Sequence, residues 1–328
     1  MTGIKIIVVL LAAIWLFSNC SQHKTEKPQR AIQENQDGIS LFMPGKISTN
    51  LPERDLAISP DGRHIYFTLQ SYKREKSVIM RMERSEGVWS EPETASFSGV
   101  HADLEPAFSP DGSRLYFVSN RPLFDSIPKK DYDIWYVDRK GGGWGPAKNL
   151  GAPVNTEKDE FYPSVVGDGS LYFTATYEDS KGTEDIYVSR FVDGQYQTPV
   201  SLDSAINSAT YEFNAYVSQD EQFMLFSSYG RSDDLGGGDL YMSVKKGTAW
   251  QPAFNLGPLM NSKGLDYCPF VSPDGKTLYF TSNRKIEEEW ERATTYSDLN
   301  KILNGPQNGF DDIYQMDFRT LMDTLSSR

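Results

Sequence analysis

Five carboxylates recur at one position of a repeated segment, and side chains of this kind bind cations or basic groups. Each lies eight residues before an Asp in a turn-like sequence. Hard cations need several oxygen ligands, so a ring of these carboxylates could hold Ca²⁺. Alternatively, each side chain accepts backbone hydrogen bonds within its own segment and recurs because the segment recurs. The five residues are Glu53, Asp103, Glu160, Glu212 and Asp266.

A second set of positions differs between the copies, as expected of a site that breaks a repeat. These polar and aromatic residues could line a pocket for a small molecule or a glycan, or they could border a water-filled channel. Two carboxylates facing each other in a pocket, drawn from Glu105, Glu160 and Glu212, could hydrolyse a glycosidic bond. The set comprises Asp55, Glu105, Tyr162, Asn214 and Cys268 and, two residues further on, Ala57, Ala107, Ser164, Tyr216 and Phe270.

Signatures of other catalytic sites are missing from the sequence. It contains no Gly-x-Ser-x-Gly, His-Glu-x-x-His or Gly-rich phosphate-binding motif. Its three His residues are scattered, at positions 23, 64 and 101. We therefore assign no catalytic residue, expect no cofactor other than Ca²⁺ at the carboxylate ring, and favour a binding protein over an enzyme.

The elements that must position these residues follow from the repeat, whose period is about 53 residues. Each copy contains an apolar strand, a tight turn and a second apolar strand. In a complete Ser-Pro-Asp-Gly turn, Pro presets φ, Asp bonds to nearby backbone and Gly accepts a positive φ. A third strand follows, and then a fourth that contains Pro, as is typical of an edge strand. The turns lie at 59–62, 109–112, 167–169, 218–221 and 272–275.

The fifth copy lacks its fourth strand, and the N-terminal segment supplies a matching one. Phe42-Met43-Pro44 resembles Trp144-Gly145-Pro146 and Trp250-Gln251-Pro252. Pairing of this segment with the last copy would close a ring and remove an exposed sheet edge. A period of this length in a β-rich chain is typical of a propeller. We therefore predict an all-β fold over residues 38–318, a five-bladed β-propeller of four-stranded antiparallel blades closed by the N-terminal strand in the last blade.

This geometry places the repeated carboxylates in the links between blades, near the mouth of the central channel on one face. Three arginines follow second strands. Each is expected to stabilise the edge of its blade by forming an ion pair with the Asp that begins the third strand. The expected pairs are Arg121 with Asp133, Arg231 with Asp239 and Arg284 with Asp312.

The fifth copy carries an insertion at residues 285–308, between its second and third strands. Residues 286–294 and 297–303 are predicted to be helical, and Ser297 is the expected cap of the second helix. We expect this insertion over or beside the channel mouth, where Trp290 and Tyr296 could dock a partner or form a lid. Alternatively, it packs on the neighbouring blade. Residues 319–328 are predicted to be a C-terminal tail.

The N-terminus is predicted to be a lipoprotein-type signal peptide at residues 1–19, because Lys5 precedes an apolar run too short to span a membrane. Cys20 would then be the lipidated first residue, and residues 20–37 form a polar tether. Cys268 is the only other cysteine, so no intramolecular disulfide is expected. A net charge of −12 without a basic cluster argues against nucleic acid as a partner. We expect membrane contact through the lipid anchor only, and a monomer.

The Ser-Pro-Asp-Gly turns flanked by apolar strands resemble the TolB-type, WD-repeat-like β-propeller repeat family over roughly residues 40–318. The ending Asn308-Gly309-Phe310-Asp311-Asp312 is similar to that of secreted lipoproteins with these repeats. The resemblance implies a periplasmic or surface-attached binding or scaffold protein, and Ser21 after Cys20 favours the outer membrane by family analogy. We therefore expect a non-catalytic cell-envelope lipoprotein whose propeller binds an envelope protein or a glycan. The alternative is a glycan-active hydrolase with a carboxylate pair at the channel mouth.

Overall fold

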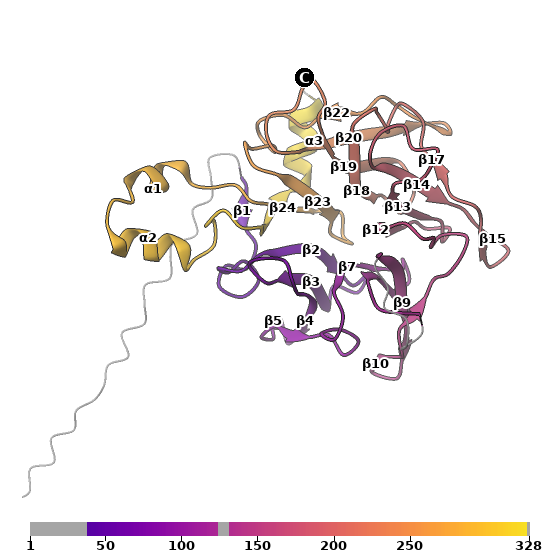
Figure 1. Ribbon diagram of the computed structural model, residues 1–328, viewed down its shortest axis with the longest axis horizontal. Helices are drawn as coiled ribbons and strands as arrows, with labels where there is room; N and C mark the ends of the chain where they lie inside the picture. Colours follow the sequence, from indigo (N-terminus) through magenta and orange to yellow (C-terminus); the bar gives the residue numbers. More distant parts are fainter. Residues whose placement is uncertain (1–37, 124–130, 327–328) are drawn as a thin grey trace, which may run out of the picture. The chain divides into compact units, whose positions relative to one another are not determined.

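Five antiparallel sheets surround a common centre in the computed structural model, which describes residues 38–123 and 131–326 (Figure 1). The innermost strand of each sheet contacts the innermost strands of both neighbouring sheets. The sheets are therefore the five blades of a β-propeller, and the predicted fold is confirmed. The innermost strands are β2 (Glu53–Ile58), β7 (Asp103–Phe108), β12 (Glu160–Val165), β18 (Tyr211–Val217) and β23 (Asp266–Val271).

The second strand of each blade is almost completely buried, because neighbouring blades cover both of its faces. Its sequence is accordingly a continuous apolar run rather than an alternating one. The third strand pairs with its outer side and is longer in most blades. The second strands are β3 (His64–Gln70), β8 (Arg114–Ser119), β13 (Leu171–Ala175), β19 (Phe223–Tyr229) and β24 (Thr277–Ser282). The third strands are β4 (Ser77–Ser85), β9 (Asp133–Lys140), β14 (Asp185–Ser189), β20 (Asp239–Lys246) and β25 (Asp312–Asp317).

The outermost strand is divided into short pieces in the first four blades. A proline stands between the pieces, where its lack of an N–H group interrupts the ladder. The pieces are β5 (Val88–Trp89) and β6 (Glu93–Thr94), β10 (Gly143–Trp144) and β11 (Lys148–Asn149), β16 (Gln195–Tyr196) and β17 (Val200–Ser201), and β21 (Ala249–Trp250) and β22 (Phe254–Asn255). In the third blade, β15 (Phe191–Val192) continues the line of the third strand and pairs with β16.

The ring closes in the fifth blade, where β1 (Ser40–Leu41) is the outermost strand beside β25. Ser40 lies opposite Gln315, and the Phe42 amide donates to the Ile313 carbonyl at 2.8 Å. The Phe42 ring is buried edge-on against Tyr279. The N-terminal strand therefore completes the last blade, as the sequence predicts.

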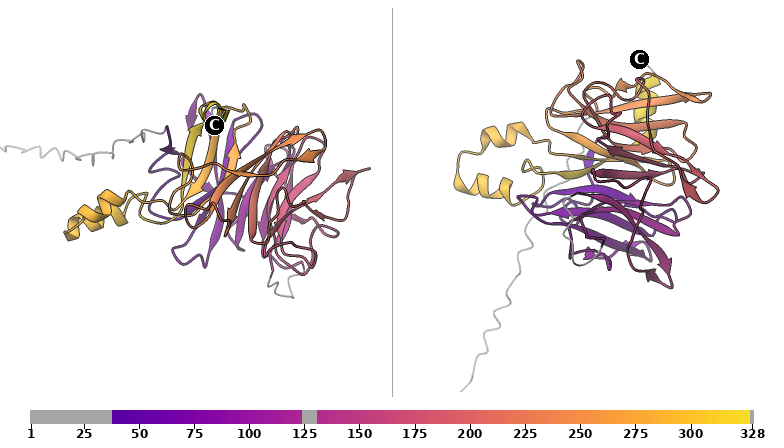
Figure 2. Two further views of the ribbon diagram at one scale, coloured as in Figure 1. Left: turned by 90° about the horizontal axis from the view of Figure 1, so that it is seen from above. Right: turned by 45° about the vertical axis from the view of Figure 1, so that its right-hand side comes forward.

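Two helices occupy the insertion of the fifth blade, α1 (Glu287–Arg292) and α2 (Tyr296–Leu303). They pack on each other and project outward from the ring instead of covering its centre (Figures 1 and 2). The cap of α2 is Thr295, which forms a capping box with Asp298, and not Ser297 as expected.

A third helix, α3 (Phe318–Ser326), follows β25 and occupies most of the segment 319–328 that was predicted to be a tail. Phe318 and Leu321 are buried against the fourth and fifth blades. Within the two described ranges, no helix is long and apolar enough to cross a membrane. The signal peptide, Cys20 and the tether lie outside the described residues.

Candidate functional site

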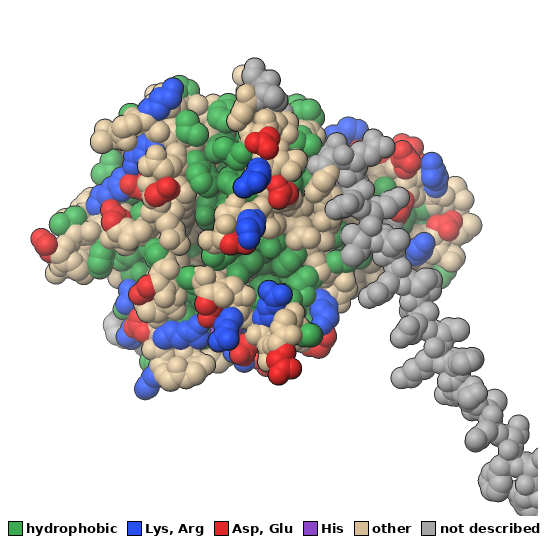
Figure 3. Space-filling model, turned by 180° about the vertical axis from the view of Figure 1, so that it is seen from behind, with side chains coloured by type: hydrophobic (Ala, Val, Ile, Leu, Met, Phe, Trp, Pro, Cys, Tyr) green, Lys and Arg blue, Asp and Glu red, His purple; other side chains and the backbone are tan. Residues whose placement is uncertain are grey.

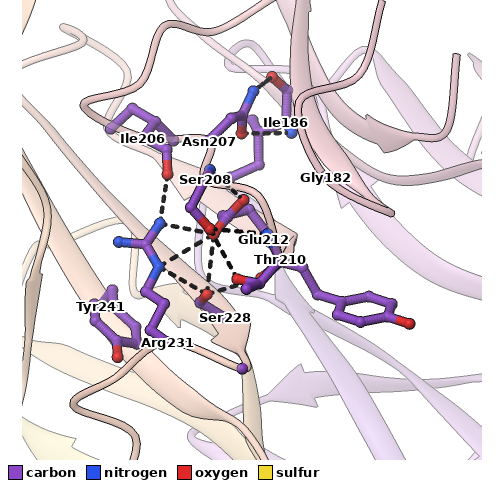
Figure 4. A network of polar contacts seen from close by, with 12 residues as sticks. Gly182, Ile186, Ile206, Asn207, Ser208, Thr210, Glu212, Ser228, Arg231 and Tyr241 are labelled. Carbon is purple, nitrogen blue, oxygen red and sulfur yellow. Dashed lines mark hydrogen bonds and ion pairs between the residues drawn. The ribbon is translucent and has the colours of Figure 1, made fainter. Parts of the chain in front are cut away.

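The five repeated carboxylates lie at the starts of the innermost strands, and each is at most 1% exposed. Figure 4 shows the arrangement around Glu212. Its Oε2 accepts the Ser208 amide at 2.7 Å, and its Oε1 accepts the Ser208 hydroxyl at 2.6 Å and Arg231 Nη2 at 2.8 Å. Arg231 Nη2 also donates to the Ile206 carbonyl at 2.5 Å. This carboxylate therefore ties its own link to the end of the second strand, as one of the two alternatives proposes.

The same arrangement recurs with Asp103 and Arg121 at 2.5 Å, and with Asp266 and Arg284 at 2.6 Å. The prediction that these arginines pair with the Asp of the third strand is wrong, because the guanidinium turns inward to the link carboxylate. Asn149, Asn255 and the Gln307 amide instead donate to the third-strand carboxylates of Asp133, Asp239 and Asp312.

Two link carboxylates have no arginine partner of this kind among the residues that the structure describes. Glu160 accepts hydrogen bonds from Thr156 and from the Tyr177 hydroxyl, and Glu53 accepts bonds from Thr49. Burial raises the pKa of Glu53 to about 9 and that of Glu160 to about 7, although these hydrogen bonds favour the ionised forms.

The carboxylate oxygens at the link positions already accept hydroxyl, amide or guanidinium donors. Such oxygens are poor ligands for a hard cation, which needs several of them at once. In residues 38–123 and 131–326, no group of three or more His, Cys, Asp or Glu side chains is arranged to hold a metal ion. Binding of Ca²⁺ by the link carboxylates stays a prediction.

The second predicted set converges at the centre of the ring. Each innermost strand has a β-bulge there, and the bulge residue has a left-handed backbone although none is Gly. A residue other than Gly in the left-handed conformation is strained. Such residues persist where the surrounding structure fixes their backbone, and they are frequent at functional sites. The five residues and their φ angles are Asp55 (60°), Glu105 (56°), Tyr162 (51°), Asn214 (52°) and Cys268 (52°).

Arg54, a residue not predicted from the sequence, holds this centre together by two ion pairs. Arg54 Nε lies 2.7 Å from Asp55 Oδ1, and its Nη2 lies 2.8 Å from Glu105 Oε1. Cys268 Sγ donates to Asp55 Oδ1 at 2.7 Å, and Asn214 Nδ2 lies 3.4 Å from Glu105 Oε1. We call these five residues the central cluster. The sequence does contain a signal for this cluster, because Arg54 is the only charged residue at its position of the repeat. The equivalent residues of the other copies are Leu104, Phe161, Phe213 and Tyr267.

In three of the five blades, a buried threonine of the preceding blade forms a hydrogen bond with the bulge residue. Thr281, Thr68 and Thr174 accept the amides of Asp55, Glu105 and Asn214 at 3.1–3.4 Å. The residue equivalent to these threonines in the second blade is Val118, which has no hydroxyl. The Tyr162 amide donates instead to Glu105 Oε2 at 2.6 Å. Glu105 is therefore a structural acceptor as well as the partner of Arg54.

A cavity of about 550 Å³ lies between the central cluster and the Ser-Pro-Asp-Gly turns, and we call it the funnel. All five innermost strands contribute to its wall, which reaches from Glu105 and Tyr162 to Pro60 and Pro273. It therefore lies toward the face opposite the link carboxylates. Aromatic side chains form much of the wall, namely Phe108, Tyr216, Phe223, Phe270 and, from α3, Phe318.

The structure thus divides the predicted site residues among four places. The link carboxylates lie on one side of the ring, the bulge residues at its centre, and Tyr216 in the funnel. Seen from behind, hydrophobic side chains are visible across the middle of the propeller between charged groups of both signs (Figure 3). Trp290 and Tyr296 lie on the projecting helices, away from the funnel.

No family model and no curated protein matches this chain. Among solved structures, TolB from Acinetobacter baumannii is 16% identical over 81% of this chain and 55% of that one, with a TM-score of 0.46. The endo-arabinase of Bacteroides thetaiotaomicron is 16% identical, with coverages of 74% and 92% and a TM-score of 0.45. The catalytic domain of the Coprinopsis cinerea GH62 alpha-L-arabinofuranosidase is 10% identical, with coverages of 81% and 90% and a TM-score of 0.46. This chain spans little more than half of the TolB chain, and these likenesses concern the fold alone.

Proposed function

We propose that this protein is a non-catalytic lipoprotein of the cell envelope that acts as a binding module, and that its funnel receives an apolar segment of a partner protein. The observation that carries the proposal is the contrast between the funnel wall and its floor. The wall is largely aromatic and aliphatic, whereas the carboxylates at the floor are engaged within the protein.

A protein segment suits this wall better than a glycan does. Sugars need many hydrogen-bonding groups, and the Ser164 hydroxyl in the wall already accepts the Val217 amide at 3.0 Å. Aromatic side chains around a concave site instead favour apolar anchors of a protein partner. Lipidation at Cys20 and an outer-membrane location remain parts of the proposal, supported by the sequence.

The alternative, a glycan hydrolase, requires two carboxyl groups about 5–10 Å apart that are free to act on one bond. Asp55 and Glu105 come together, but both contact Arg54. Glu105 also accepts the Tyr162 amide. This engagement favours a structural role for the pair, and the binding function is the simpler account.

The experiment that tests the proposal is site-specific photo-crosslinking in the native envelope from a probe at Tyr216. We expect the probe to capture one defined protein. Ala107→Trp, which fills the funnel, should abolish capture, whereas Ala249→Trp, at the exposed residue of β21, should leave it intact. Equal capture by both variants would contradict binding in the funnel. Turnover of a polysaccharide by the purified protein, abolished by Glu105→Gln, would favour the hydrolase.

A further inference from the structure

The turn of the fourth blade, at the rim of the funnel, departs from the Ser-Pro-Asp-Gly sequence of the first, second and fifth blades. It has Gln219 in place of Pro and Glu221 in place of Gly. The Gln219 carbonyl accepts the Gly167 amide of the third blade at 2.8 Å. A Cβ at position 167 would lie only 2.7 Å from that carbonyl oxygen, so this close approach requires Gly. The turn is therefore tied to its neighbour and forms part of the funnel wall.

Asp220, in this turn, differs from the other turn aspartates. Of the five, all of which the structure describes, Asp220 alone lines the funnel. In the first, second and fifth blades the turn Ser donates its hydroxyl to the turn Asp at 2.5–2.7 Å. Within the described residues, the exposed Asp220 carboxylate accepts only the Gln222 amide, at 3.2 Å on Oδ1. The carboxylate of Asp220 is therefore available to a ligand in the funnel.

The charged side chains of the funnel are both acidic. They are Asp220 at the rim and Glu105 at the floor, and no Lys, Arg or His stands among the described residues of the wall. Glu105 is already held by Arg54 and by the Tyr162 amide. The charge that the funnel presents to a ligand is therefore negative and lies at Asp220.

The wall also offers few hydrogen-bond donors to a ligand. Several of its backbone amides, such as those of Val217, Phe223 and Phe318, already donate within the protein. Four wall residues are prolines, which have no N–H group. An anionic ligand would find few donors here, whereas an ammonium or guanidinium group brings its own donors to Asp220. The prolines are Pro60, Pro106, Pro163 and Pro273.

Four aromatic rings pack in a row in the same wall. The Phe223 ring lies 5.4 Å from Phe318 and 6.1 Å from Tyr216, and Tyr216 lies 5.8 Å from Phe270, between centroids. Burial and the nearby charge of Asp220 raise the pKa of the Tyr216 hydroxyl, which therefore stays protonated. Rings of this kind can contact both apolar side chains and the face of a cation. We call these four residues the aromatic row.

We propose that the segment received by the funnel carries an Arg or Lys side chain between apolar ones, and that this cation pairs with Asp220 at the rim. The apolar neighbours then contact the aromatic row. The inference rests on the proposed function, because it names the chemistry of the same partner segment. It predicts selectivity by charge, since Asp220 repels an acidic segment and the described wall holds no cation to compensate.

The test measures the binding of three capped tripeptides to the purified full chain in lipid nanodiscs by isothermal titration calorimetry. The probes are acetyl-Leu-Arg-Phe-amide and its analogues with Gln or Glu in place of Arg. At low salt we expect the Arg peptide to bind about fivefold more tightly than the Gln peptide, and the Glu peptide to bind most weakly. The difference should shrink at about 1 M salt, where the Debye length is about 3 Å.

Three variants locate the effect. Asp220→Asn keeps an acceptor for the Gln222 amide and should remove the preference for Arg over Gln. The matched control is Asp111→Asn, in the turn of the second blade, where the carboxylate bonds to Ser109 and Ser113 outside the funnel wall. It should keep the preference. Asp220→Lys should reverse the order of the Arg and Glu peptides.

Four outcomes separate the inference from the proposed function. A preference for Arg that Asp220→Asn removes and Asp111→Asn retains supports the inference. Equal binding of the three peptides, abolished by Ala107→Trp, overturns the ion pair and leaves the proposed function standing. A preference for Arg that Asp220→Asn does not change also overturns the inference. Absence of binding at millimolar concentration, or binding that Ala107→Trp does not weaken, overturns both.

Discussion

Glu105 shows how one substitution within a repeat changes the role of another residue. In three blades a threonine hydroxyl accepts the bulge amide of the next blade. Val118 lacks that hydroxyl, and Glu105 takes over the Tyr162 amide at 2.6 Å. A buried amide without an acceptor costs about 1–3 kcal/mol, so this replacement matters for stability. An irregular acid near a channel is therefore not by itself evidence of catalysis.

We predict that Val118→Thr partly rescues Glu105→Ala. The single Glu105→Ala change leaves the Tyr162 amide without its acceptor and should lower the free energy of unfolding by more than about 1 kcal/mol. A threonine at 118 can offer the hydroxyl that its equivalents offer in other blades. Urea denaturation of the two single variants and the double variant gives the coupling energy. Strictly additive effects would contradict this account of Glu105.

The link between blades is the recurring element of this fold, and its carboxylate joins three segments. In the fourth blade Glu212 contacts Ser208 in the link, Ser228 at the end of β19, and Arg231 in the next loop. The arginine then reaches back to the Ile206 carbonyl. A carboxylate buried to this degree is tolerable only while its partners remain.

We predict that Arg231→Met lowers the free energy of unfolding by about 3–5 kcal/mol, because it leaves Glu212 buried without its cation. The matched control is Arg190→Met, which removes an arginine that is 43% exposed and paired with Glu221. That change should cost less than about 1 kcal/mol. Thermal or urea unfolding of both variants measures the two changes. Equal decreases in the free energy of unfolding would show that the buried pair of Arg231 and Glu212 contributes no more than an exposed pair.

The elements themselves are largely predictable from the sequence, because each depends on local patterns. The Ser-Pro-Asp-Gly turns, the apolar strands and the closing strand at Phe42 all carry such patterns. The helix α3 was predictable too, since Phe318, Leu321, Met322 and Leu325 have helical spacing. The partner of Arg231 was not, because a long side chain can reach either of two carboxylates from one strand end. The funnel was not predictable either, because its wall combines residues of all five innermost strands. The pattern of a single repeat does not show which of these side chains meet.

At the scale of the molecule, closure depends on a few residues at the start of the described chain. Phe42 joins the fifth blade to the core shared with the first, beside Tyr279 and Ile313. We predict that Phe42→Ala lowers the free energy of unfolding by about 3–5 kcal/mol. Phe254→Ala, at a 40% exposed ring on the outer strand of the fourth blade, is the control and should have a much smaller effect. A small loss for Phe42→Ala would mean that the ring closes without this contact.

The seam between the fifth and first blades also makes the whole fold sensitive to pH. Burial raises the pKa of Glu53 to about 9 and that of Asp312 to about 8, although hydrogen bonds from Thr49 and Gln307 oppose the shifts. In the unfolded chain the pKa values of such groups lie near their ordinary values of 4.5 and 3.8. As pH rises through the interval between these values, the unfolded chain releases protons that the folded protein retains, so stability must fall.

We therefore predict a urea midpoint that is highest near about pH 5 and declines toward about pH 9. Glu53→Gln keeps an acceptor for the Thr49 amide but removes the titrating group, so its decline should be shallower. Glu178→Gln, at an exposed position, should follow the unmodified protein. Carboxyl groups whose pKa is lowered, such as Glu221 with its bonds from Tyr172, Arg190 and Lys245, act in the opposite sense but only at more acidic pH. A midpoint that rises between about pH 5 and pH 9 would show that Glu53 and Asp312 are ionised in the folded protein, with counter-charges that the seam does not display.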